Sequence, residues 1–184
     1  MDLADRVVGS ALGLALGDAL GAPFEFLRAR HVPDPIPAFE RPWLSEPPGS
    51  TTDDTAMARN LMRSLAAQQR FDPDDLLERH LEWFRSDPPD VGTLTGRVLR
   101  RIAAGEDAAT AAQEIWNERG PEVSAGNGSV MYCAPLGAFR AARPELTRRS
   151  VSIAFQLAGA ALASRGARGR AEKSPERPDS TAPM

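Results

Sequence analysis

The chain has 184 residues, of which 42% are hydrophobic and 26% charged, as in an ordinary globular protein of one domain. Its 22 basic and 25 acidic side chains are well mixed and give a net charge of −3, so the sequence has no basic pattern for nucleic acid. The one cysteine, Cys133, excludes an internal disulfide framework and suits a reducing compartment, so we expect a cytoplasmic protein. The two histidines, His31 and His80, are too few for a histidine-rich metal site, and we expect both to lie at the surface or half-buried.

The first predicted helix covers about residues 2–20. Its uncharged run from Val7 to Leu16 is well short of the roughly 20 residues that a membrane-spanning helix needs. The segment before it carries Asp2 and Asp5, whereas a signal peptide begins with positive charge. We therefore expect no membrane partner.

Glycine recurs at every fourth position along this helix. Each glycine lowers helix stability by roughly 1 kcal/mol relative to alanine, and a stripe of them lets another backbone or a ligand approach closely. Tight helix packing explains the stripe best; its members are Gly9, Gly13, Gly17 and Gly21. Asp18 interrupts the apolar run. Glu25, between Phe24 and Phe26, has a setting more typical of a surface side chain than of a catalytic one.

Residues 32–49 contain six prolines in eighteen residues and cannot be helical for long. A loop of this length inside a compact domain is usually functional or disordered. A lid or substrate-facing loop and a solvated surface crossing fit the sequence about equally well.

The stretch "STTDDTAMA", from Ser50 to Ala58, allows two explanations. Thr52 is well placed as an N-cap, and the helix dipole favours Asp53 and Asp54 in the first turn by about 0.3–1 kcal/mol each. Successive helical residues also point roughly 100° apart, so the two aspartates could hold two different ions, with Thr52 adding an oxygen. Hard cations such as magnesium prefer oxygen ligands.

The remaining segments predict further helices and no strand. We expect helices at about 53–68, 73–86, 91–104, 107–118, 128–142 and 145–164. Leu77, Leu81 and Phe84 have the spacing of a core-facing stripe. Residues 1–164 are predicted to form one helical domain. The tail at 165–184 has no large apolar residue except Met184, so we expect it to be disordered.

The stretch "GNGSVM" predicts a glycine turn that opens a helix. Backbone N–H groups that converge in such a turn favour phosphate. By itself the turn is a weak signal, because turns of this composition usually bind nothing. The four residues concerned are Gly126, Asn127, Gly128 and Ser129.

Three stretches occur in the order "GSALGLALGDALGAPFEF", "TTDDTAM" and "GNGSVMYCAPLGAF". Together they resemble the ADP-ribosylglycohydrolase family over residues 5–152 or so. The resemblance implies an all-α orthogonal helical bundle around a binuclear magnesium or manganese site. It also implies a hydrolase of the glycosidic bond between ADP-ribose and an acceptor such as a protein arginine. The expected partner is thus an ADP-ribosylated protein or a small ADP-ribose-containing substrate.

The resemblance also implies roles for individual residues. Thr52, Asp53 and Asp54 correspond to metal ligands, and Glu25 together with Asp54 to catalytic residues. The turn at 126–129 corresponds to the loop that binds the diphosphate of ADP-ribose.

The sequence departs from the family pattern in its last part. A second acidic cluster of the type D-x-D-T completes both metal shells in the family, whereas the carboxylates after residue 150 are Glu172, Glu176 and Asp179, all in the tail. We therefore expect a C-terminally truncated or frameshifted member, with the apolar faces of helices 53–68 and 128–142 exposed. Such a chain is either an enzyme or an inactive relative that binds weakly or has no function.

Overall fold

The computed structural model describes residues 2–119, 128–131 and 133–141, and within these ranges the regular structure is helical, which confirms the all-α prediction. The elements are α1 (Leu3–Gly21), η1 (Ala22–Phe24), η2 (Ala29–His31), α2 (Asp53–Gln68), α3 (Pro73–Arg85), α4 (Thr93–Ala103), α5 (Ala108–Arg119), α7 (Gly128–Met131) and α8 (Ala134–Ala141). The helix predicted at 145–164 and the tail at 165–184 lie outside the described residues.

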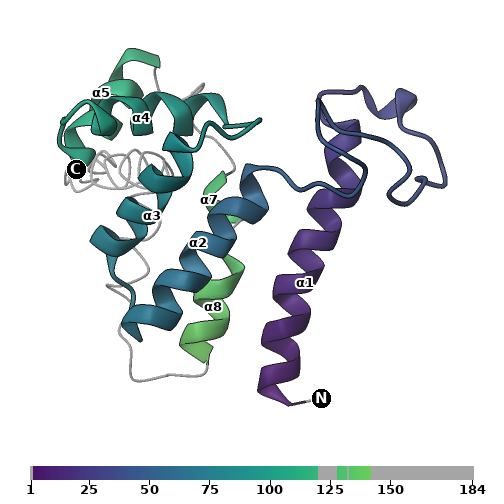
Figure 1. The fold of residues 1–184 in the computed structure, drawn as a ribbon, viewed down its shortest axis with the longest axis horizontal. Helices are drawn as coiled ribbons and strands as arrows, with labels where there is room; N and C mark the ends of the chain where they lie inside the picture. Colours follow the sequence, from purple (N-terminus) through teal and green to yellow (C-terminus); the bar gives the residue numbers. More distant parts are fainter. Residues whose placement is uncertain (1, 120–127, 132, 142–184) are drawn as a thin grey trace, which may run out of the picture.

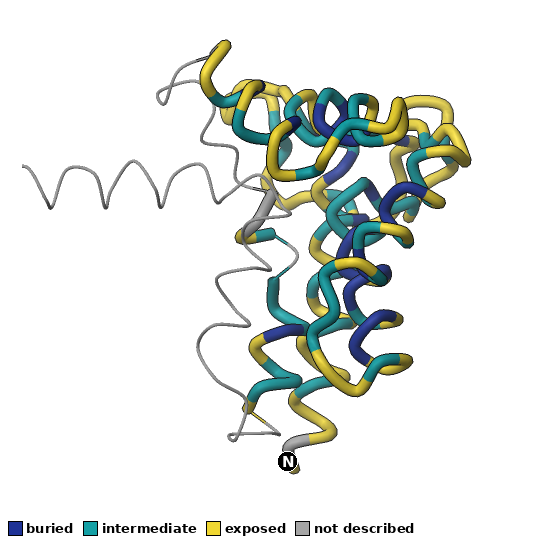
Figure 2. The backbone as a smooth tube through the Cα atoms, turned by 90° about the vertical axis from the view of Figure 1, so that its left-hand side faces the viewer, coloured by how far each residue is buried: buried dark blue, intermediate teal, exposed yellow. Residues whose placement is uncertain are grey.

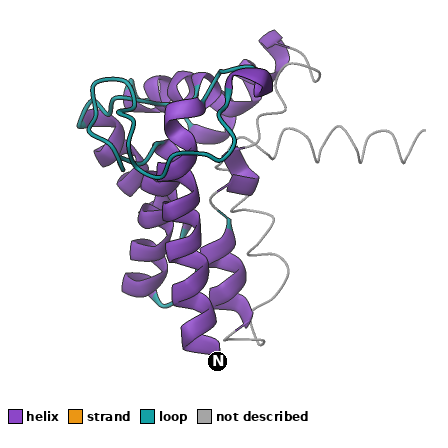
Figure 3. Cartoon of the chain, turned by 90° about the vertical axis from the view of Figure 1, so that its right-hand side faces the viewer, coloured by secondary structure: helices purple, strands orange, loops and turns teal. Residues whose placement is uncertain are grey.

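Helix α2 is the centre of the bundle (Figure 1). It packs against α1, α3 and α8, while α4 and α5 pack on each other and α4 contacts α3. The long loop that leads from α1 to α2 lies at the end of the bundle away from the N-terminus (Figure 3). The first turn of α2 therefore begins where this loop ends.

The hydrophobic core follows one face of α2. Figure 2 colours the buried parts of the backbone dark blue. The members of the core recur at helical spacing and meet one leucine each from α3 and α8; they are Met57, Ala58, Leu61, Leu65, Leu76 and Leu136. Burying a side chain of this size contributes about 1.5–3 kcal/mol. The prediction that the apolar face of helix 53–68 would be exposed is therefore wrong.

Helix α1 carries a row of exposed apolar side chains. Val8, Leu12 and Leu16 are 56%, 57% and 56% exposed. Within the described part of the chain, no atom would lie within 4 Å of a Cβ added at Gly9, Gly13, Gly17 or Gly21. The tight packing predicted for the glycine stripe is therefore not found.

Two aspartates begin α1 in a reciprocal capping box. The Asp5 N–H donates to Asp2 over 2.8 Å, and the Asp2 N–H donates to Asp5 over 3.1 Å. By length and composition alone the stretch Ala4–Phe24, of mean hydropathy 1.4, is long and apolar enough to cross a membrane. This stretch is longer than the uncharged run from Val7 to Leu16, because it includes the charged residues on either side of that run. Core helices of soluble proteins also meet this criterion.

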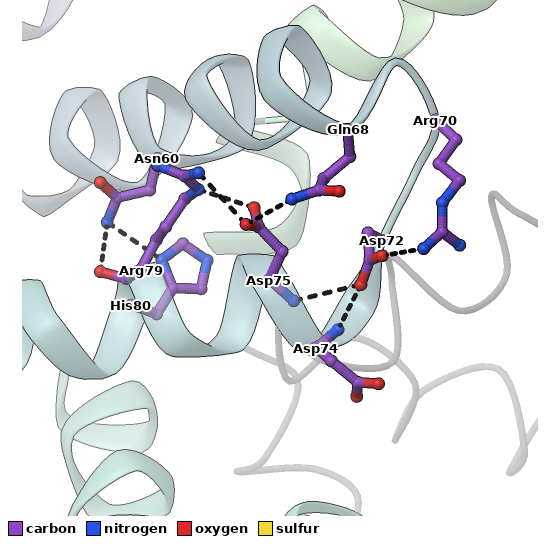
Figure 4. Close-up of polar contacts among 8 residues, drawn as sticks. All are labelled: Asn60, Gln68, Arg70, Asp72, Asp74, Asp75, Arg79 and His80. Carbon is purple, nitrogen blue, oxygen red and sulfur yellow. Dashed lines mark hydrogen bonds and ion pairs between the residues drawn. The ribbon is translucent and has the colours of Figure 1, made fainter.

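A polar network joins α2 to α3 (Figure 4). Asp75 accepts from Gln68 and from Arg79, over 2.9 and 2.7 Å. Asn60 donates to the Arg79 carbonyl over 3.2 Å and lies 3.3 Å from Nδ1 of His80. His80 is only 2% exposed, which contradicts the expectation of a surface or half-buried residue. Its burial lowers its pKa to about 4, so the imidazole is neutral near pH 7.

Two details of the helix prediction are also wrong. The helix expected at 128–142 is broken between α7 and α8, because Pro135 lacks an N–H and its ring would clash with the carbonyl one turn earlier. In α3 the most buried residues are Leu76, His80 and Leu81, whereas Leu77 and Phe84 are half-buried. The core stripe thus lies close to the predicted one but is rotated around the helix.

Candidate acidic site at the start of α2

Thr52 is the N-cap of α2, as predicted. Its Oγ1 accepts from the Asp54 N–H over 3.3 Å, and its backbone is extended. The residue is 4% exposed. Asp53 and Asp54 follow in the first turn, where the helix dipole favours negative charge.

Asp18 of α1 reaches across to the same helix start. Its Oδ2 accepts from the Thr52 N–H over 3.0 Å, from the Thr55 N–H over 3.2 Å and from the Thr55 hydroxyl over 2.5 Å. One carboxylate thus satisfies two backbone donors that the helix leaves unpaired. Asp18 was not predicted to belong to the site, although a charge that interrupts an apolar helix was a usable signal.

Asp53 connects the site to the loop before α4. Its Oδ2 accepts from the Gly92 N–H over 2.8 Å. Asp90 of this loop also hydrogen-bonds Asp53. Burial, followed by the repulsion of Asp53, raises the pKa of Asp90 to about 6. Asp90 was missed in the sequence, because only the folded chain brings it to α2.

Asp54 lies among the other carboxylates and is half-buried. Burial is the largest cause that raises its pKa to about 7, followed by the charges of Asp53, Asp18, Glu25 and Asp90 in that order. The site thus concentrates negative charge at one end of the bundle.

Glu25 follows η1 directly and turns toward this charge. Burial raises its pKa, as do Asp53 and Asp18, whereas a hydrogen bond from the Trp43 side chain lowers it. Its Oε2 is buried and has no hydrogen-bond partner within the described chain. The sequence-based view of Glu25 as a surface side chain is therefore replaced by a part-buried carboxylate, one oxygen of which has no hydrogen-bond partner among the described residues.

These residues fit a hard cation in their donor chemistry. Several carboxylates repel one another here, and a cation would relieve that repulsion. Within the described ranges, however, no three Asp, Glu, His or Cys side chains form a ligand group for a metal.

The predicted diphosphate loop is only partly described. Gly126 and Asn127 lie outside the described residues, while Gly128 and Ser129 begin the short helix α7. Its role in binding ADP-ribose stays a prediction.

A cleft of about 350 Å³ opens beside the first turns of α2. It is bounded by the proline-rich loop, by α2 and by the segment after α3. Its lining includes Trp43, Glu46, Asp53, Arg59, Trp83 and Asp90. Part of the loop at 32–49 thus faces a cavity, which favours the substrate-facing alternative over a simple surface crossing.

The fold and the site together make this an all-α protein with a cluster of carboxylates at the start of its central helix, α2. Residues 1–165 match the ADP-ribosylglycohydrolase family, and the chain belongs to that family.

Individual relatives agree with this assignment. The ADP-ribosyl-dinitrogen reductase glycohydrolase of Rhodospirillum rubrum is 39% identical over 135 residues, which cover 71% of this chain and 43% of that protein. The ADP-ribosylarginine hydrolase Tri1 of Pseudomonas putida (strain GB-1) is 32% identical over 148 residues, covering 74% of this chain and 36% of the relative. The ADP-ribosylhydrolase ARH3 of Gallus gallus is 33% identical over 148 residues, which cover 71% of this chain and 39% of that protein.

A solved structure shows the same fold. A chain of an ADP-ribosylglycohydrolase-related protein complex superposes with a TM-score of 0.62 at 38% identity, covering 86% of this chain and 49% of that one. The chain therefore spans less than half the length of the relatives it matches.

Proposed function

We propose that this protein hydrolyses the glycosidic bond between ADP-ribose and an acceptor such as a protein arginine, and that it requires a divalent cation, magnesium or manganese. The observation that carries the proposal is the meeting of Asp18, Glu25, Asp53, Asp54 and Asp90 at the start of α2. The names of the relatives support the reaction class, because they are hydrolases of ADP-ribosyl bonds.

Glu25 is the best general base of this site. Its Oε2 has no hydrogen-bond partner within the described chain and can accept a proton from a water molecule, and burial raises its pKa, which makes the carboxylate a stronger base. The water oxygen bonds to the anomeric carbon of the ribose. The bond from that carbon to the acceptor nitrogen breaks, and its electron pair stays with the acceptor. The proton taken by Glu25 then passes to the acceptor nitrogen.

Asp53 and Asp54 act as positioning and charge-bearing groups. Asp53 accepts a hydrogen bond from the Gly92 N–H. The carboxylate of Asp54 is repelled by its neighbouring carboxylates. A bound cation would supply positive charge that holds the ribose hydroxyls and polarises water. Thr52 would add an oxygen at the same helix start, as the family resemblance implies.

The test uses the full chain with an ADP-ribosylated arginine peptide and millimolar magnesium or manganese. We expect release of ADP-ribose, which Glu25→Gln lowers by about 10²–10⁴-fold, the usual contribution of a general base. Glu40→Gln is the matched control, because Glu40 is exposed on the loop that follows η2. Release that is the same in Glu25→Gln and in the unmodified chain contradicts the mechanism.

The second candidate is a family member that binds without turnover. The incomplete ligand group among the described residues favours it. It predicts that magnesium and ADP-ribose bind weakly while no ADP-ribose is released at any cation concentration. Release that requires both the cation and Asp54 rejects this candidate.

A further inference from the structure

A second cleft, of about 580 Å³, opens where α3 ends and α4 begins. Its lining carries three guanidinium groups, those of Arg85, Arg97 and Arg100, and one carboxylate, that of Asp87. Three positive charges and one negative charge give this basic cleft a net charge of +2, whereas the whole chain carries −3. The basic cleft therefore attracts anions on a weakly acidic protein.

The segment that joins α3 to α4 separates the basic cleft from the acidic site. Asp90 of this segment hydrogen-bonds Asp53 on the acidic side. The next residue, Val91, lines the basic cleft and lies against α4, where a Cβ added at Gly96 would be 3.3 Å from its Cγ1. An anion in the basic cleft is therefore kept apart from the carboxylates at the start of α2.

Two arginines of the basic cleft already bind carboxylates of the chain itself. Arg97 pairs with Glu118 over 2.6 Å, and Arg85 pairs with Glu78 over 3.4 Å. The four side chains are between 40% and 71% exposed, and pairs between such exposed groups are weak in water. Carboxylates from another molecule can therefore replace Glu78 and Glu118 at little cost.

Arg100 has a different contact. Its guanidinium lies 6.0 Å from the centroid of the Phe84 ring, within range of a cation–π interaction. Within the described ranges no ion pair includes Arg100, and the residue is exposed. A contact with the face of a ring leaves the N–H groups of the guanidinium able to donate to an acceptor. Arg100 can therefore bind a carboxylate while Phe84 restrains its side chain.

The start of α4 adds positive potential to the same place. The N-cap residue Gly92 has no side chain to cap the helix, and no acidic residue lies in the first turn. In contrast, α2 and α3 each have two aspartates in the first turn. Thr93, the first residue of α4, lines the basic cleft, so the positive end of the helix dipole lies beside the three arginines.

We propose that the basic cleft binds an acidic segment of another protein, whose carboxylates pair with Arg85, Arg97 and Arg100. Planar guanidinium groups bind carboxylates through paired hydrogen bonds, and two of the three already hold a glutamate. A cleft of this volume suits a ligand much larger than a single inorganic anion. The proposal goes beyond the proposed hydrolase activity and does not depend on it.

Nucleic acid suits the basic cleft less well. Its affinity comes from the neutralisation of many phosphates along a backbone. Around the three arginines lie the carboxylates of Glu78, Asp87 and Glu118, which would repel a long phosphate chain. A short acidic peptide needs only the three arginines.

The test measures peptide binding to the full chain by fluorescence anisotropy at low salt. The probe is a labelled hexaglutamate peptide, and hexaglutamine, a thymidine hexanucleotide and inorganic phosphate are compared with it. We expect saturable binding of hexaglutamate that weakens as salt is added, and much weaker binding of the other three. Equal binding of hexaglutamine, tighter binding of the hexanucleotide, or displacement of the peptide by an equal concentration of phosphate overturns the proposal.

Variants of opposite sign assign the binding to the basic cleft. Arg100→Gln and Arg85→Gln, both at exposed positions, are each expected to weaken hexaglutamate binding about tenfold, as loss of a charge-assisted pair predicts. Asp87→Asn removes the one carboxylate of the lining and should tighten binding about twofold. Arg63→Gln, at an exposed position of α2 outside the cleft, is the matched control and should leave binding unchanged.

The outcome does not depend on catalysis. Unchanged affinity in both Arg100→Gln and Arg85→Gln, or an equal loss in Arg63→Gln, overturns the proposal. Binding that follows the expected signs supports it even if the chain releases no ADP-ribose, so its failure and that of the proposed function are distinguishable.

Discussion

Asp18 accepts a 2.5 Å hydrogen bond from the hydroxyl of Thr55, and so joins α1 to the first turn of α2. The same carboxylate oxygen accepts the backbone N–H groups of Thr52 and Thr55. These bonds fix the direction in which the next residues, Asp53 and Asp54, leave the helix start. Asp18 therefore acts on the site through the backbone.

Replacing Asp18 tests this anchoring role. Asp18→Ala removes a charged acceptor shared by three donors, and we expect it to lower the free energy of unfolding by about 1.5–3 kcal/mol. Asp18→Asn keeps an acceptor oxygen and should recover part of this loss. Urea unfolding measures both values. Glu82→Ala, at an exposed position of α3, is the control and should stay within about 0.5 kcal/mol. Equal stability of Asp18→Ala and this control would refute the anchor.

Cation binding is expected to depend on the paired aspartates. Asp53→Asn and Asp54→Asn each remove one charged oxygen donor, and fewer charged ligands lower the affinity for a hard cation. Asp53→Asn should also weaken the bond to the Gly92 N–H. Calorimetric titration with magnesium and manganese measures the effect, with the exposed Asp74→Asn as control. Unchanged cation affinity in both variants would contradict the assignment of Asp53 and Asp54 as cation ligands.

The raised pKa of Asp54 predicts an unusual pH dependence for the cation-free protein. Its pKa is about 7 in the fold against an ordinary 3.8, so between these values the folded state binds more protons than the unfolded state. Stability contributed by this group is therefore lost as the pH rises from about 4 to about 7. A single titrating group contributes a slope of at most about 1.4 kcal/mol per pH unit, and solvent screening of the half-buried Asp54 lowers its total contribution. Asp54→Asn should remove this slope, as should saturating magnesium. If the free energy of unfolding in EDTA varied with pH in the same way in Asp54→Asn and in the unmodified chain, Asp54 would not be the source of the slope.

His80 predicts a dependence of the opposite sign. Burial lowers its pKa to about 4 from 6.5, so the unfolded chain binds more protons in this window. Stability is lost as the pH falls from about 6.5 to about 4, by at most about 1.4 kcal/mol per pH unit. The slope difference between His80→Gln and the unmodified chain isolates this effect from that of Asp54. His31→Gln, at an exposed position, should leave the slope unchanged.

The helix starts could be predicted because a cap depends on residues within one turn. Thr52 and Asp72 cap α2 and α3 as their local sequences indicate. The partners of the acidic site could not be predicted in this way. Asp18 lies 34 and 37 residues from the groups it binds, and Asp53 lies 39 residues from Gly92. Those approaches depend on tertiary packing, which no local pattern encodes.

Burial was predicted less well than helix position. The apolar stripe of α2 is buried by α3 and α8, although the family comparison suggested that it would be exposed. His80 was expected to be at the surface or half-buried, yet it is buried and Asn60 gives it a partner inside the α2–α3 contact. In contrast, the break before α8 had a local signal in Pro135. The helical spacing of the apolar residues on both sides of it favoured one continuous helix instead.

The last prediction concerns the exposed stripe on α1. Val8, Leu12 and Leu16 recur every four residues and are each more than half exposed, so they form a continuous apolar strip. Strips of this kind promote association between copies. We expect the full chain to self-associate, as measured by light scattering after size-exclusion chromatography. Leu12→Ser should shift the chain toward the monomer with a stability change of about 0.5 kcal/mol or less. Leu14→Ser is the matched comparison on the same helix, because Leu14 packs against the core. It should lower the free energy of unfolding by about 1–3 kcal/mol and leave association intact. A monomeric unmodified chain, or equal effects of the two substitutions on association, would show that the α1 strip is not the surface through which copies meet.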